Sequence, residues 1–173
     1  MISDFSLSKD KIFIIAEIGN NHNGSLPRAL EMIDKSVELG VDCVKFQMRN
    51  LKEVYREKSL DKSGDDLGTE YIIDLLNRFE LTVEEHKKIA DYCSKIGIKY
   101  LCTPWDKKSL GTLEEFKVEA YKVASADLTN IPLIDSICDT KKPIILSTGM
   151  STNAEVKEVV SFLNKRNVEF CLL

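Results

Sequence analysis

The sequence has few of the residues that mark metal-binding, secreted or membrane proteins. It contains two histidines and five cysteines in 173 residues, and no CxxC pair. An odd number of cysteines without that spacing favours neither a zinc site nor a disulfide framework. No window of about 18 uncharged apolar residues occurs, so no transmembrane helix is expected. The first residues carry no basic segment and no cleavage pattern, so no secretory signal peptide is expected.

Charge and composition narrow the classes further. The net charge is −4, and lysine and arginine form no cluster, which argues against a nucleic-acid-binding surface. Apolar residues make up 43% of the chain, enough to build a core and too many for a disordered polymer. The cysteines stand in or beside apolar runs. We therefore expect small buried thiols in a reducing cytosol, and a cytoplasmic protein without membrane contact.

Short apolar runs alternate with amphipathic stretches along the chain. The runs are too short for helices and rich in β-branched and aromatic residues, so they predict six strands at residues 12–18, 43–47, 99–103, 120–123, 144–147 and 170–173. Helix starts are marked by Ser25 with Pro27, by Asn130 with Pro132, and by the capping boxes Thr82-x-x-Glu85 and Thr152-x-x-Glu155.

This alternation predicts an α/β protein with six parallel strands and five helices. Two architectures fit the pattern: an open doubly wound sheet, or part of a (β/α)8 TIM barrel. No GxGxxG motif follows the first strand, which disfavours a dinucleotide-binding sheet. One connection is unusual, because residues 48–68 are polar with little apolar periodicity. Since most βα loops have about 2–6 residues, this stretch is either a lid or binding loop, or a mobile surface insertion.

Polar side chains stand at the carboxyl ends of the predicted strands, where parallel α/β proteins bind their ligands. The candidates are Glu17, Lys45, Gln47, Thr103, Lys122, Ser125, Asp127 and Ser147. His22 follows the first strand among asparagines, and both a hydrogen-bonding role in the loop and a ligand contact fit it. For Trp105, cover of the core at a helix start is favoured over a platform for a ligand.

Two of these candidates are lysines inside apolar strands, which is costly unless the ammonium group meets an anion. Lys45 and Lys122, with the nearby hydroxyls, could form a pocket for a phosphate or carboxylate. Glu17 and Asp127 could then handle protons or orient hydroxyls. The alternative is an internal network of ion pairs, in which Glu17 neutralises Lys45 and Asp127 neutralises Lys122.

Five segments, taken in order, resemble the sialic acid synthase family, which includes N-acetylneuraminate synthases and their pseudaminate and legionaminate relatives. The segments are AEIGNNHNG at residues 16–24, VKFQ at 44–47, TP at 103–104, YKVASAD at 121–127 and PIILSTGM at 143–150. The resemblance runs from about residue 11 to the last residue. It implies a (β/α)8 barrel, of which residues 1–173 would be the N-terminal portion, without the antifreeze-like domain common at the C-terminus of the family.

The resemblance also implies an activity. The family condenses phosphoenolpyruvate with an N-acylated amino-sugar aldehyde, such as N-acetylmannosamine, to give a nine-carbon nonulosonic acid and phosphate. Lys45, Thr103, Lys122, Ser125 and Ser147 would hold phosphoenolpyruvate, and Glu17 and Asp127 would act near the reacting carbons; Gln47 and His22 are further candidates. The family commonly has glutamate where this chain has Asp127. A divalent metal, Mn²⁺ or Mg²⁺, is expected to have its ligands beyond Leu173, and the full-length protein is expected to be a homodimer.

Two other functions stay open from the residues alone. Lys45 or Lys122 could form a Schiff base in an aldolase. The chain could also be a non-catalytic module that binds a sugar or a phosphate. Because a complete barrel needs about 250 residues, we expect the 173-residue piece by itself to lack synthase activity.

Overall fold

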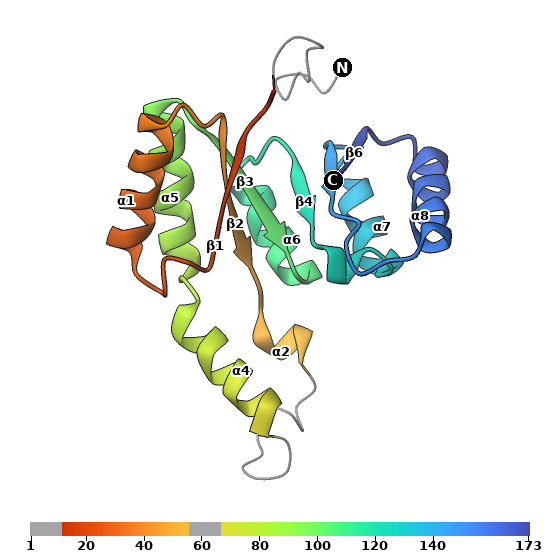
Figure 1. The fold of residues 1–173 in the computed structure, drawn as a ribbon, viewed down its shortest axis with the longest axis horizontal. Helices are drawn as coiled ribbons and strands as arrows, with labels where there is room; N and C mark the ends of the chain where they lie inside the picture. The colour runs from red at the N-terminus through yellow and green to blue at the C-terminus, as the bar shows by residue number, and fades with distance from the viewer. Residues whose placement is uncertain (1–11, 56–66) are drawn as a thin grey trace.

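The computed structural model describes residues 12–55 and 67–173, and these form one parallel sheet with helices packed against it (Figure 1). The six strands follow one another in the sheet in the order of the sequence. Their bounds are β1 Ile15–Gly19, β2 Cys43–Met48, β3 Lys99–Pro104, β4 Tyr121–Val123, β5 Ile144–Leu146 and β6 Phe170–Leu172. Consecutive order with parallel pairing is the arrangement of a (β/α)8 barrel, so it decides against the doubly wound sheet.

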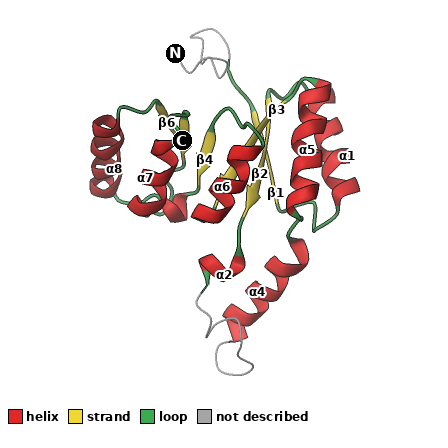
Figure 2. Ribbon diagram, turned by 180° about the vertical axis from the view of Figure 1, so that it is seen from behind, coloured by secondary structure: helices red, strands yellow, loops and turns green. Residues whose placement is uncertain are grey.

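The helices connect the strands, and α1, α5, α7 and α8 begin at the predicted capping residues. They are α1 Leu26–Glu38, α2 Leu51–Val54, α4 Leu67–Phe79, α5 Val83–Ile96, α6 Lys107–Glu115, α7 Ile131–Asp139 and α8 Asn153–Arg166 (Figure 2). The Thr82 and Thr152 hydroxyls accept hydrogen bonds from the backbone N–H groups of Glu85 and Glu155, and both capping boxes are complete. None of the helices in the described ranges is long and apolar enough to cross a bilayer.

The stretch between β2 and α5 differs from the sequence prediction. A loop was expected at residues 48–68, but α2 forms one turn there and α4 begins at Leu67, so the described chain has seven helices where the pattern predicted five. Asn50 caps α2 by accepting a hydrogen bond from the Lys52 N–H. One turn is too short to show helical periodicity in a sequence. Residues 56–66, the middle of the predicted loop, lie outside the described residues.

The two faces of the sheet bury different sets of side chains. The main core joins one face to the helices, with fully buried residues such as Phe46, Tyr121 and Leu146 packed against Ile33 and Ile89. A smaller cluster covers the other face, here called the inner face. It contains no helical residue and consists of Cys43, Leu101, Ala120 and Ile145, with Phe13 and Ile15 at its margin.

Strand geometry then locates the polar candidates. Side chains two residues apart point to the same face of a strand. Glu17, Lys45, Thr103, Lys122 and Ser147 each lie two residues beyond a member of the inner-face cluster, toward the carboxyl end. The inner face therefore carries an apolar layer and, nearer the carboxyl ends of the strands, a polar layer. The polar layer is the candidate site.

Candidate active site

Lys45 lies at the centre of the polar layer, on β2. Its side chain is buried, with 7% of the residue exposed. Its Nζ lies 2.7 Å from Oε2 of Glu17, whose backbone pairs with that of Lys45 in the β1–β2 register. Glu17 is about half exposed, with 53% of its side chain accessible. The ion pair expected as the internal alternative is therefore present here, and one carboxylate partner keeps contact with solvent.

Lys122, on β4, has a different environment. It is 4% exposed, and its Nζ donates to Oγ of Ser147 at 2.6 Å and to the backbone carbonyl of Val123 at 3.0 Å. Burial lowers the pKa of Lys122; the charge of Glu17 opposes this effect and the charge of Lys45 adds to it. In the alternative network Asp127 would neutralise Lys122, but here neutral oxygens bind this ammonium group and Asp127 bonds Asn130.

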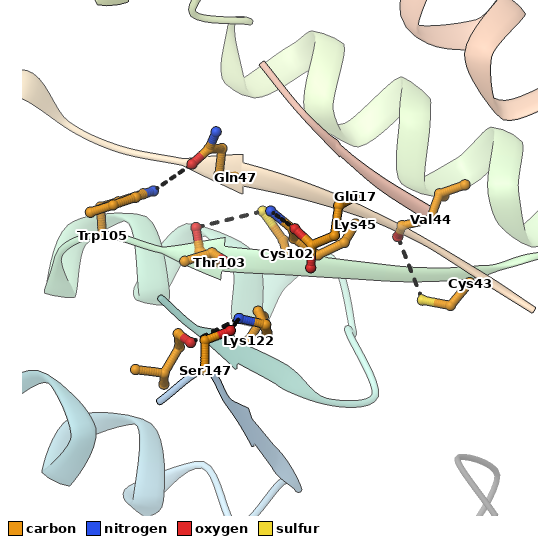
Figure 3. A network of polar contacts seen from close by, with 11 residues as sticks. Glu17, Cys43, Val44, Lys45, Gln47, Cys102, Thr103, Trp105, Lys122 and Ser147 are labelled. Atoms are coloured by element: carbon orange, nitrogen blue, oxygen red, sulfur yellow. Dashed lines mark hydrogen bonds and ion pairs between the residues drawn. The ribbon is translucent and has the colours of Figure 1, made fainter. Parts of the chain in front are cut away.

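Thr103 stands on β3, the strand between the two lysine-bearing strands, and is buried. Figure 3 shows Lys45 beside Glu17, Lys122 beside Ser147, and Thr103 on the strand between these pairs. Two ammonium groups and two hydroxyls thus lie on one face of the four neighbouring strands β2 to β5. One carboxylate offsets two cations here, so the layer favours a bound anion.

Ser125 and Asp127 follow β4 in a short 3-10 helix, η1, at Ser125–Asp127. Oδ1 of Asp127 accepts a hydrogen bond from Nδ2 of Asn130 at 3.0 Å, and Asn130 caps α7. Among the described residues Oδ2 of Asp127 is buried without a partner, and burial raises the pKa of this carboxyl group. Ser125 packs beside Gly149, so the ends of β4 and β5 come together.

Gln47 is also on β2, opposite Thr103 in the register, and is tied to the start of the next connection. Its Oε1 accepts a hydrogen bond from the indole N–H of Trp105 at 2.9 Å. The guanidinium carbon of Arg49 lies 4.8 Å from the centre of the Trp105 ring. Trp105 is half-buried at the start of the connection after β3, and its indole binds the Gln47 amide at the edge of the candidate site.

Arg49 and Glu80 are two charged residues that sequence analysis missed. Nε of Arg49 lies 3.0 Å from Oε1 of Glu80, and their side chains are 7% and 20% exposed. Burial raises the pKa of Glu80 to about 7 against the attraction of Arg49, and the charge of Asp106 adds to the increase. No spacing rule joins two residues so far apart in the chain, so no sequence signal indicates this pair.

His22 lies on the helix-facing side of the sheet, and the two lysines lie on the inner face. It is buried, its ring stacks on Phe46 at a centroid distance of 5.9 Å, and its Nδ1 accepts a hydrogen bond from the N–H of Gly24 at 3.1 Å. This arrangement matches the loop-bonding role. A second buried histidine, His86 on α5, lies near it, with Nδ1 3.4 Å from the hydroxyl of Tyr100.

The described residues form no cluster of metal-binding side chains. No three His, Cys, Asp or Glu side chains in the described ranges gather closely enough to hold one. Glu17 is committed to Lys45, and His22 to the loop after β1. Four cysteines are buried thiols as expected, whereas Cys171 is half-buried. Burial raises the pKa of Cys93 and of Cys102 to about 12, which makes both poor thiolate ligands at neutral pH.

The polar layer can now be compared with known proteins. The sequence model of the NeuB family matches residues 32–173. The chain belongs to the NeuB family. Its relatives include the N,N'-diacetyllegionaminic acid synthase of Campylobacter jejuni, 34% identical over 163 residues, and the N-acetylneuraminate-9-phosphate synthase of Mus musculus, 32% identical over 168 residues. These alignments cover 92% and 95% of this chain but 48% and 46% of the relatives, so the chain spans about half their length.

Solved structures agree with this membership. The N-acetylneuraminic acid synthetase of Leptospira borgpetersenii, solved with citrate, superimposes with a TM-score of 0.84 at 32% identity, over 95% of this chain and 54% of that one. A truncated 3-deoxy-D-arabino-heptulosonate 7-phosphate synthase from Thermotoga maritima has a TM-score of 0.61 at 17% identity and shares the fold. The predicted resemblance to sialic acid synthases and the predicted incomplete TIM barrel are both confirmed.

Proposed function

We propose that this NeuB-family chain carries the phosphoenolpyruvate site of a nonulosonic acid synthase. The proposed reaction condenses phosphoenolpyruvate with an N-acylated amino-sugar aldehyde, N-acetylmannosamine or a relative, and releases phosphate. The observation that supports it best is the pair of buried lysines, Lys45 and Lys122, on one face of the sheet. Phosphoenolpyruvate has a phosphate and a carboxylate, so it offers one anionic group to each ammonium.

In this proposal the residues around the lysines position the substrate. The hydroxyls of Thr103, Ser125 and Ser147 would donate to its oxygens. Ser147 already accepts from Lys122, which leaves its own proton free to donate outward. Since Thr103 sits between the lysine-bearing strands, its hydroxyl can reach a group held by either lysine.

Two carboxyl groups would serve the condensation itself, which joins C3 of phosphoenolpyruvate to the aldehyde carbon, while water adds at C2. Glu17 is half exposed and salt-bridged to Lys45, so it can orient a hydroxyl or water beside the lysine. Asp127 has one free buried oxygen and a raised pKa, so it can hold or pass a proton near the reacting carbons. The amino-sugar substrate is supported by the relatives, which are an N,N'-diacetyllegionaminic acid synthase and an N-acetylneuraminate-9-phosphate synthase.

A divalent metal, Mn²⁺ or Mg²⁺, would polarise the aldehyde when bound. By the family resemblance, we propose that its ligands lie beyond Leu173. A homodimeric, cytoplasmic enzyme likewise remains part of the proposal.

The decisive experiment measures phosphate release by the complete natural polypeptide that contains this chain. The proposal predicts release only when phosphoenolpyruvate and an N-acylated amino sugar are both present, with a nine-carbon acid formed in equal amount. Release without sugar, or no release with any of N-acetylmannosamine, its 6-phosphate and a diacetylated dideoxy sugar, contradicts it.

A Schiff-base aldolase is the second candidate, because the lowered pKa of Lys122 is what an amine nucleophile requires. Borohydride treatment in the presence of pyruvate separates the two functions. A covalent adduct on Lys122 supports the aldolase. Phosphoenolpyruvate binding with neither adduct nor turnover supports a non-catalytic binding module instead.

A further inference from the structure

A chain of four side chains runs from the end of α4 to the edge of the proposed active site. Glu80 pairs with Arg49, Arg49 lies over Trp105, and Trp105 donates to Gln47. Gln47 is on β2, and the other three residues come from separate connections, after β2, after α4 and after β3. Figure 3 shows the last link, with the Trp105 indole directed at the Gln47 amide.

The last link determines how the Gln47 amide is oriented. An indole N–H can only donate, so the atom that meets it at 2.9 Å must be the amide oxygen. The amide nitrogen Nε2 is therefore directed the other way, and it lies close to Gly19, where an added Cβ would be 3.3 Å away. The Gln47 amide, two residues beyond Lys45 on β2, thus has its oxygen on Trp105 and its nitrogen beside the end of β1.

The contacts of Glu80 with Arg49 and of Arg49 with Trp105 fix the position of the Trp105 ring. Its backbone is set by the N–H bond to the Met48 carbonyl at 3.0 Å, which leaves the side-chain rotamer to be chosen. The Arg49 guanidinium covers the ring at 4.8 Å, a distance at which cation–π attraction acts. Glu80 holds that guanidinium in place, and with 7% of its side chain exposed Arg49 has little freedom to leave.

We propose that Arg49 is a positioning residue of the proposed active site: anchored by Glu80, it holds the Trp105 ring, and Trp105 fixes the orientation of the Gln47 amide. This inference rests on the proposed function. Gln47 lies two residues beyond Lys45 toward the carboxyl end of β2, so we expect its amide to meet the acceptor sugar, above the phosphoenolpyruvate that the lysines hold.

The test uses the single tryptophan of this chain as a reporter, together with steady-state kinetics. Arg49→Met, Trp105→Phe and the double variant are made in the complete natural polypeptide. If that polypeptide has further tryptophans, they are first replaced by phenylalanine. Arg166→Met is the matched control, because Arg166 is half-buried and pairs with Asp135 and Asp139 on the far side of the sheet from this cluster.

The expected result has two parts. Arg49→Met red-shifts the Trp105 emission and raises KM for the amino sugar roughly three- to tenfold, the effect of losing one oriented hydrogen bond, while KM for phosphoenolpyruvate stays within about twofold. Trp105→Phe raises the sugar KM to a similar extent, and the double variant is no worse than Trp105→Phe alone, because both changes break the same link. Arg166→Met changes neither readout.

Several outcomes overturn the inference. They are an unchanged Trp105 emission in Arg49→Met, KM values for both substrates that rise together, or single-variant effects that multiply in the double variant. If Arg49→Met does not fold, an unchanged sugar KM in Trp105→Phe is enough to overturn it. If the unsubstituted protein does not catalyse the condensation, the proposed function is wrong. The fluorescence emission of Trp105 in Arg49→Met and in Gln47→Leu then tests the inference by itself.

Discussion

The two faces of the sheet bury polar side chains to a similar extent, but they satisfy those side chains in different ways. On the helix-facing side, His22 and His86 are closed in by Phe46, Tyr100 and the loop after β1. On the inner face, Lys45 contacts the Glu17 carboxylate, and Lys122 contacts the Ser147 hydroxyl and the Val123 carbonyl. The closed set stabilises the fold, whereas the open set keeps donors available for a ligand. Burial by itself therefore does not distinguish a structural polar residue from a functional one. The number of hydrogen-bond donors that remain available for a ligand does.

The largest effect is expected from emptying the helix-facing core. Phe46 is fully buried between the rings of His22 and Tyr100. Phe46→Ala should lower the free energy of unfolding by about 3–5 kcal/mol, because it removes a large apolar side chain and leaves a cavity. Urea denaturation measures this loss. Val37→Ala, at an exposed position of α1, is the control, and a loss below about 1 kcal/mol for Phe46→Ala would show that this face is not the stabilising one.

The inner face should show the reverse pattern. Lys122→Met is expected to reduce kcat/KM for the proposed condensation at least about 100-fold, since it removes a cation that meets the anionic substrate. Stability should hardly fall, because an apolar chain replaces a buried charge. Lys99→Met, at the opposite end of β3, is the matched control and should retain activity. Equal activity in the two variants would remove the functional distinction between the faces.

The helix-facing side should also make the stability of the protein depend on pH. Burial lowers the pKa of His86 from 6.5 to about 4, with the charge of nearby His22 adding to the effect and Glu85 opposing it. The unfolded chain takes up this proton near pH 6.5 and the folded protein only near pH 4. The stability that neutral His86 contributes is therefore complete above pH 6.5 and declines as the pH falls toward 4, by about 3 kcal/mol.

The measurement for His86 is urea denaturation at several pH values between 7.5 and 4.5, on the unsubstituted protein and on His86→Phe. The variant keeps an aromatic ring but cannot titrate, so its stability should depend less on pH in this window. Parallel curves for the two proteins would show that the buried histidine does not govern acid sensitivity.

The smallest expected effect concerns a helix cap on the covered face. Thr82→Ala removes the hydroxyl that accepts from the Glu85 N–H and starts α5. It should cost about 1 kcal/mol of unfolding free energy and leave the proposed activity unchanged. Ser94→Ala, at an exposed position of the same helix, is the comparison and should change stability by less than about 0.5 kcal/mol. A loss of activity in Thr82→Ala would connect α5 to the inner face.

Local signals in the sequence were sufficient for most of the fold. Each of the six strands and four of the capped helix starts, at Ser25, Thr82, Asn130 and Thr152, were predicted, because capping oxygens and short apolar runs act within a few residues of the chain. The single turn of α2 was not, and α4 was missed because the polar stretch before it suggested a loop. For the site, the period of two along a strand was enough to place Lys45, Thr103 and Lys122 on one face.

Pairing between distant residues was decided only by the tertiary structure. The sequence contains Glu17 on the first strand and Asp127 after the fourth, and nothing local shows which lysine each would meet. Strand register brings Glu17 to Lys45, while the turn of η1 and the cap of α7 direct Asp127 to Asn130.

The Arg49–Glu80 pair is likewise decided by the tertiary structure, because its two residues are distant in the sequence and only the folded chain brings them together. What the sequence by itself determined is the alternation of strands and helices and the residue types of the polar layer, since these depend on near neighbours. Which of those polar groups are satisfied within the protein and which stay free for a ligand depends on contacts across the sheet.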